Sequence, residues 1–100
     1  MPKLDICVSH QLTRDEAAGR IKGLLGQMKE EYGENVKDLK EDWSRDSCRF
    51  SFSVMGSSIS GTLDILSDKV QINGNLPFAA SLFKGKIEET IREKASELLA

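Results

Sequence analysis

The sequence has few of the residues that most often carry chemistry. Its 100 residues include one histidine and two cysteines, Cys7 and Cys48, which lie far apart in the chain. A zinc site needs paired cysteines or histidines, and a disulfide scaffold needs more cysteines than this. We therefore expect no metal and no cofactor, and two reduced thiols that serve as small strand residues. A Cys7–Cys48 disulfide would require Cα atoms within about 7 Å of each other.

Long apolar runs and an excess of one charge are also missing. No apolar stretch reaches the roughly 18 residues that cross a bilayer, and Lys3 and Asp5 stand where a signal peptide would be apolar. Fourteen basic and sixteen acidic residues are interspersed and leave a net charge of -2, whereas a nucleic-acid-binding protein concentrates basic residues on one face. We expect a cytoplasmic protein with no membrane span and no nucleic-acid partner.

The composition that is present is that of an ordinary globular protein. Hydrophobic residues make up 39% of the chain and charged residues 30%, which is typical of a folded domain. A length of 100 residues suits one core. We expect a single domain over residues 1–100.

The first third of the chain alternates and then changes to helical spacing. Residues 3–9 place apolar side chains at every second position, which predicts a strand with one buried face. Thr13 and Glu16 have the spacing of a capping box, so a helix is expected to begin there and to end at Gly33. Three internal glycines would each cost it about 1 kcal/mol relative to alanine. Its apolar stripe consists of Ala17, Ala18, Ile21, Leu24, Leu25, Met28 and Tyr32.

The middle of the chain has the two-residue period of strands. Turns at Met55–Ser58 and Ser67–Asp68 imply antiparallel neighbours, and Gly74–Asn75 is expected to end the pattern. The alternate positions are polar, so only one face of the sheet should be covered. Four strands are expected, the first of them irregular, over residues 36–44, 47–54, 59–65 and 70–72.

The last quarter predicts a long amphipathic helix that the other elements pack against. Its Leu76–Pro77 step suits a helix entry, because proline has a fixed φ and needs no amide partner in the first turn. Charged residues lie away from the apolar stripe. The stripe consists of Leu76, Ala79, Ala80, Phe83, Ile87, Ile91, Ala95 and Leu98.

Together these elements predict an α+β fold in the order β-α-β-β-β-β-α. Two helices would lie on one face of a curved antiparallel sheet. This arrangement resembles a shortened helix-grip fold (START/SRPBCC-like), in which a sheet wraps around the C-terminal helix. A cystatin-like sheet, which also curls around a helix, is the alternative. A strand before the first helix and a long terminal helix favour the helix-grip interpretation.

An ordered set of short segments resembles the polyhydroxyalkanoic acid system protein family over nearly the full length. One departure is Ser44–Asp46, since many members have Gly-Asp after the tryptophan turn. The resemblance implies that this chain is one of the small bacterial proteins that are often encoded near polyester storage-granule genes. It therefore implies a granule or hydrophobic-ligand context and supplies no catalytic residues. The segments are Ser9–Leu12, Ala17, Ala18, Arg20, Trp43, Phe50–Phe52, Gly61–Leu63, Val70, Leu76–Pro77, Phe83–Glu88 and Ile91.

Five aromatic residues are the candidates for an apolar binding cleft between the sheet and the terminal helix. In a helix-grip fold this gap holds the ligand, and a cavity of several hundred Å3 could take an acyl chain. The alternative is that these side chains fill the core, because a small domain has little apolar surface to spare. The five are Trp43, Phe50, Phe52, Phe78 and Phe83.

Two other features have competing interpretations. His10 has no partner for catalysis in its pattern, so we expect its ring to bond backbone at the strand end or helix entry. Lys84 and Lys86 could contact phosphate or a negatively charged granule surface. The alternative for these lysines is a solvated face that pairs with Glu88 and Glu89.

The sequence supports two functional hypotheses of different classes. The first is a non-enzymatic small domain of the polyhydroxyalkanoate system type, which binds a hydrophobic or acyl ligand or associates with storage granules. The second is a structural interaction module that forms a homodimer through its sheet. We do not expect an enzyme, because His10 stands alone.

Overall fold

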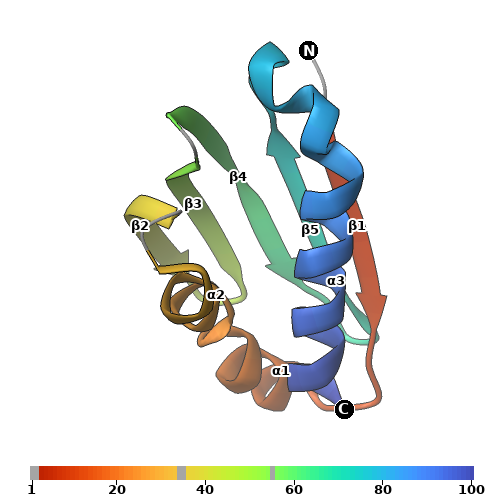
Figure 1. Cartoon of the computed structure of the whole chain (residues 1–100). Coiled ribbons are helices and arrows are strands. Elements are labelled where there is room, and N and C mark those ends of the chain that lie inside the picture. Colours follow the sequence, from red (N-terminus) through yellow and green to blue (C-terminus); the bar gives the residue numbers. More distant parts are fainter. Residues whose placement is uncertain (1–2, 34–35, 55) are drawn as a thin grey trace.

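The computed structural model describes residues 3–33, 36–54 and 56–100. Strands and helices follow the predicted order, with two local changes (Figure 1). The elements are β1 (Lys3–Ser9), α1 (Arg14–Ile21), α2 (Leu24–Tyr32), β2 (Val36–Ser44), β3 (Ser47–Val54), β4 (Ser57–Ile65), β5 (Lys69–Asn75), the 3-10 helix η2 (Phe78–Phe83) and α3 (Lys84–Leu99).

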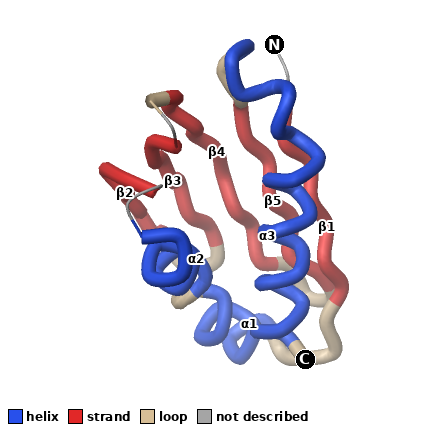
Figure 2. The backbone as a smooth tube through the Cα atoms, viewed as in Figure 1, coloured by secondary structure: helices blue, strands red, loops and turns tan. Residues whose placement is uncertain are grey.

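The strands form one antiparallel sheet in the order β1-β5-β4-β3-β2. The helices lie on one side of it, as Figure 2 shows, and β1 and β2 are its edges. Exposed and buried residues alternate along β1 without exception. The predicted α+β class, the antiparallel sheet and the single covered face are therefore confirmed.

The first predicted helix is in fact two helices, so that prediction was wrong in one respect. Its start is confirmed: Thr13 Oγ1 accepts from the Glu16 amide at 3.1 Å, and Glu16 Oε1 accepts from the Thr13 amide at 3.3 Å. The chain then turns at Gly23, whose amide donates to Arg20 O at 3.4 Å. Glycine weakens a helix interior, and the break lets α1 and α2 each bury their own apolar side chains. Gly33 ends α2 with φ 54°.

The last predicted helix also begins later than its sequence pattern indicated. Phe78–Phe83 is a 3-10 helix, and the α-helix starts at Lys84. A 3-10 helix has three residues per turn. The side chains before Lys84 therefore do not line up along the apolar stripe that an α-helical period predicts. Ile91, Ala95 and Leu99 are the buried residues of α3, while Phe83 is half exposed. The side chains of Tyr32, Ala79 and Ala80, which belong to the predicted stripes, lie outside the described part of the chain.

Two strand boundaries also differ from prediction. β5 continues through Gly74 and Asn75, which were expected to break it. Both residues pair with β4 on one side and with β1 on the other, so a full ladder outweighs the weak strand preference of the glycine. The turn predicted at Met55–Ser58 includes Met55, which lies outside the described residues. Gly56 adopts φ 82° there, and β2 is irregular as predicted, with Asp38 at φ 55°.

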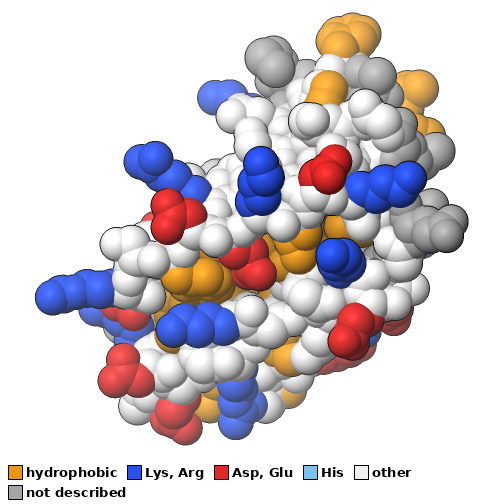
Figure 3. Space-filling model, turned by 90° about the vertical axis from the view of Figure 1, so that its left-hand side faces the viewer, with side chains coloured by type: hydrophobic (Ala, Val, Ile, Leu, Met, Phe, Trp, Pro, Cys, Tyr) orange, Lys and Arg blue, Asp and Glu red, His pale blue; other side chains and the backbone are white. Residues whose placement is uncertain are grey.

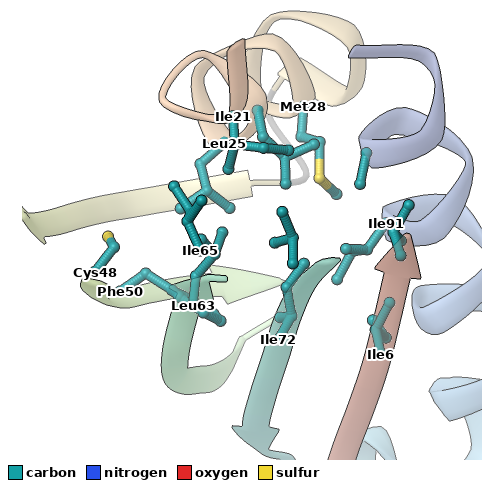
Figure 4. Close-up of a cluster of buried hydrophobic side chains, with 14 of the residues drawn as sticks. Ile6, Ile21, Leu25, Met28, Cys48, Phe50, Leu63, Ile65, Ile72 and Ile91 are labelled. Atoms are coloured by element: carbon teal, nitrogen blue, oxygen red, sulfur yellow. The ribbon is translucent and has the colours of Figure 1, made fainter. Parts of the chain in front are cut away.

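One cluster of buried side chains joins the helices to the sheet. Figure 4 shows Ile21, Leu25 and Met28 of α1 and α2 facing Ile65 and Ile72 of the sheet. The α3 side of the cluster is formed around Ile91, and Leu4, Ile6 and Val8 supply the β1 side.

Candidate functional site

The structure divides the five aromatic candidates into two groups. Phe50 and Phe52 are buried on the covered face of β3, with ring centroids 6.1 Å apart. Trp43 is half-buried on the edge strand β2, and the Lys22 ammonium lies 5.6 Å from its ring centroid. By contrast, Phe78 and Phe83 belong to η2, with 85% and 49% of their surface exposed. The predicted cleft lined by all five residues is therefore not formed, because the 3-10 helix turns the last two outward.

Two hollows among the described residues are lined by other side chains. One of about 470 Å3 is lined by side chains of β2, β3 and β4, and a second of about 410 Å3 by β1, β4 and β5. None of the five aromatic residues contributes to either. Most lining side chains alternate with the buried ones, so the hollows lie on the uncovered sheet face. They are lined by Asp42, Ser44, Ser47, Cys48, Arg49, Thr62 and Asp64, and by Lys3, Leu4, Asp5, Gly61, Thr62, Asn73, Gly74 and Asn75.

Three large apolar side chains are exposed together on η2. Leu82 is 89% exposed and Phe78 is 85% exposed, and Phe83 adds its half-exposed ring. We call Phe78, Leu82 and Phe83 the apolar tip. η2 lies at the end of the molecule where β5 stops (Figure 1), and Figure 3 shows hydrophobic side chains at that end.

The backbone holds the apolar tip in its exposed position. Leu76 is fully buried just before it and fixes the chain to the core. Pro77 precedes η2 with φ -61°, and Ser81 Oγ donates to Phe78 O at 2.7 Å. A 3-10 turn places residues three apart above one another, so this bond closes the turn beneath the exposed side chains.

Sequence reasoning missed Leu82 as a site residue. The signal was present, because Leu82 and Phe78 are large apolar residues that lie off the predicted stripe and are four positions apart. Large apolar residues on the polar side of an amphipathic helix have no core to enter. They predict an exposed apolar surface.

Polar contacts fix α3, and with it the apolar tip, to the rest of the fold. The Asp5 amide on the edge strand β1 donates to Glu88 Oε2 at 3.1 Å. Lys94 Nζ lies 2.7 Å from Glu31 Oε2 of α2, and this hydrogen bond, more than other effects, raises the pKa of Lys94. Arg20 of α1 donates to the Leu98 carbonyl at the end of α3.

The ring of the single histidine bonds backbone on both sides, as predicted. His10 is 8% exposed, and the Leu12 amide donates to its Nδ1 at 3.1 Å. Nδ1 is therefore the acceptor, so Nε2 carries the proton and donates to Leu66 O at 2.9 Å. The Nε2 bond joins the end of β1 to the turn between β4 and β5, and the Nδ1 bond holds the segment that leads into α1.

The cysteines are free and differ in environment. Cys7 is exposed, whereas Cys48 is 1% exposed, and burial raises the pKa of the Cys48 thiol. Within the described residues no group of three or more His, Cys, Asp or Glu side chains could hold a metal ion. No helix of that part of the chain is long and apolar enough to span a membrane.

Comparison with known proteins identifies the family. A crystal structure of the protein TTHA0849 from Thermus thermophilus is similar with a TM-score of 0.44 and 15% identity, over 98% of this chain and 92% of that one. No curated protein matches the chain. The model of the family described as "Putative polyhydroxyalkanoic acid system protein (PHA_gran_rgn)" matches residues 4–99. The chain therefore belongs to this polyhydroxyalkanoic acid system family.

Proposed function

We propose that the protein is a non-enzymatic member of the polyhydroxyalkanoate system that associates with the storage granule through its apolar tip. The observation that carries this proposal is the exposure of Phe78 and Leu82, at 85% and 89%. Burial of one such side chain stabilises a complex by about 1.5–3 kcal/mol. A polyester surface is a partner that can bury them without a shaped pocket.

The family supports the same partner. Its description names the polyhydroxyalkanoic acid system, whose product is a water-insoluble polyester. A protein that works beside such a polymer needs either an internal site for an acyl chain or an external apolar surface. The external surface is present in the apolar tip, so we favour granule association and a cytoplasmic location beside the granules.

An internal acyl ligand is the second form of this proposal and is less well supported. The helix-grip interpretation places a ligand between the sheet and α3, and we retain a shortened helix-grip fold as a proposal. In the described structure Phe50 and Phe52 are 4% and 6% exposed and belong to the packed core. An acyl chain in that position would have to displace residues of this packed core.

Dimerisation through the sheet is the alternative function, and the edges of the sheet argue against it. β2 is bulged between Lys37 and Lys40 and is rich in charge. On β1, Glu88 already accepts from the amide of Asp5. Bulges, charges and covered amides are the features by which edge strands avoid pairing with other chains.

Sedimentation with washed polyester particles tests the proposed function. The variant Phe78→Ser/Leu82→Ser should lose most of its binding, because the apolar contact is removed. Leu66→Ser is the control, since Leu66 is also an exposed leucine, at 36%, but belongs to the turn between β4 and β5, and this turn lies at the opposite end of the molecule from η2 (Figure 1). Equal unfolding temperatures would show that each variant folds. Full binding by the double variant would refute a role for the apolar tip.

A further inference from the structure

Two lysines directly follow the apolar tip, and the sequence that leads up to them contains no carboxylate. Lys84 and Lys86 occupy the first turn of α3, and no Asp or Glu occurs between Asp68 and Glu88. The whole chain has a net charge of -2. The chain segment that carries the apolar tip is therefore basic, although the whole protein is acidic.

Neither lysine is used in an ion pair of the described structure. The salt bridges there join Arg14 to Asp46, and Lys94 to Glu31 and Glu97. Glu88, which could pair with Lys84 along the helix, instead accepts from the Asp5 amide. The pairing of these lysines with Glu88 and Glu89 that the sequence suggested is thus absent from the described part.

A third lysine lies near the same end. Lys3 is exposed and pairs in the sheet with Asn75, the last residue of β5 before the chain enters η2. In Figure 3 several Lys and Arg side chains, with Asp or Glu side chains among them, lie below the hydrophobic side chains at this end of the molecule. Apolar side chains at the end of the molecule, followed by lysines, are typical of segments that bind at the interface between a lipid layer and water.

This pattern distinguishes between two apolar surfaces. A bare polyester is neutral, so unpaired lysines add nothing to its binding. A layer of anionic lipid offers acyl chains to the apolar tip and headgroup phosphates to the ammonium groups, at the depth that each requires. Each lysine held near an anionic surface strengthens binding about five-fold.

We infer that Lys84 and Lys86, with the apolar tip, form a docking site for a surface of anionic phospholipid. The inference rests on the proposed function, because it adds an anionic lipid surface to the polyester that the same apolar tip meets. Phe78 and Leu82 enter the acyl layer, and the lysines contact phosphates at its boundary. Lys3 adds to the attraction at the same end.

Vesicle binding tests the site. We would measure the binding of the full chain to vesicles of phosphatidylcholine, with and without phosphatidylglycerol, and to lipid-free polyester particles. The variant Lys84→Gln/Lys86→Gln should bind the anionic vesicles roughly 30-fold more weakly than the wild type. It should bind lipid-free polyester as the wild type does. Lys29→Gln/Lys40→Gln is the control, because it removes the same charge from exposed lysines of α2 and β2.

The outcomes separate this inference from the proposed function. Stronger binding to anionic vesicles, weakened by added salt, and a selective loss in the Lys84/Lys86 variant would support the docking site. Equal binding to both vesicle types, no vesicle binding at all, or a loss equal to that of the control variant would overturn it. If Phe78→Ser/Leu82→Ser still bound polyester fully, the proposed function would fail instead, whatever the vesicles showed.

Discussion

Gly61 of β4 lies directly opposite Gly74 of β5, and the ring of Phe50 on β3 occupies the space where a side chain on Gly61 would lie. A Cβ on Gly61 would come 2.7 Å from Gly74 Cα and 2.9 Å from Phe50 Cζ, and closer still to the Asn73 carbonyl. Two of these neighbours, the Asn73 carbonyl oxygen and Gly74 Cα, are backbone atoms of β5. The close approach of β4 and β5 at this point therefore requires glycine.

Gly61→Ala should consequently destabilise the protein by about 1–3 kcal/mol, the usual cost of overpacking. Urea unfolding followed by circular dichroism would measure it. Gly26→Ala is a matched control, because nothing lies within 4 Å of its Cβ position in α2. That control should stabilise the fold by up to about 1 kcal/mol through helix propensity. A Gly61→Ala variant as stable as the wild type would contradict the described approach of the strands.

His10→Ala should cost about 1–3 kcal/mol, because it leaves the Leu66 carbonyl and the Leu12 amide without their ring partners in a part-buried site. Binding to polyester particles should not change, since β1 ends, just before His10, at the opposite end of the molecule from η2 (Figure 1). Unfolding and sedimentation measured on the same sample would check both expectations. Lost binding by a folded variant would indicate a functional histidine and contradict the structural role.

Much of the fold could be predicted because strand patterns are local. Phe50 and Phe52 alternate with serines, and the structure buries the phenylalanines as that alternation requires. Gly74 was assigned to a break from local preference alone, but its pairing with Gly61 and Leu4 decides its conformation. That pairing joins residues far apart in the sequence, so no local pattern contains it.

The candidate site was harder to predict than the fold. Phe83 fits an α-helical stripe, and only the 3-10 geometry of η2 places it half outside. The difference between 3.0 and 3.6 residues per turn over one short segment converts a predicted cleft residue into an exposed one. The neighbouring Phe78 and Leu82 were visible in the sequence as apolar residues off the stripe.

The stability of the protein should fall in alkaline solution through Cys48. Burial raises the pKa of this thiol above its ordinary value, so the unfolded chain loses the proton first as pH rises. The contribution of this thiol to the free energy of unfolding is complete below about pH 8.5, the usual pKa of a free thiol. It is lost as pH rises through the pKa that the thiol has in the folded protein. The free energy of unfolding, compared between wild type and Cys48→Ala from about pH 7 to pH 10, should show a shrinking difference. Cys7→Ala, at an exposed site, should follow the wild type. A constant difference between wild type and Cys48→Ala would contradict the buried thiol.

Alanine substitutions of the phenylalanines should separate core from apolar tip. Phe50→Ala should cost about 3–5 kcal/mol, because the residue is 4% exposed and its loss leaves a cavity beside Gly61. Phe78→Ala should change stability by less than about 0.5 kcal/mol, as exposed sites usually do, yet weaken binding to polyester. Urea unfolding should therefore detect the effect of Phe50→Ala, and sedimentation should detect the effect of Phe78→Ala. A large loss of stability in Phe78→Ala would mean that η2 packs against the fold more closely than described. The apolar tip would then be part of the core and not a surface for a partner.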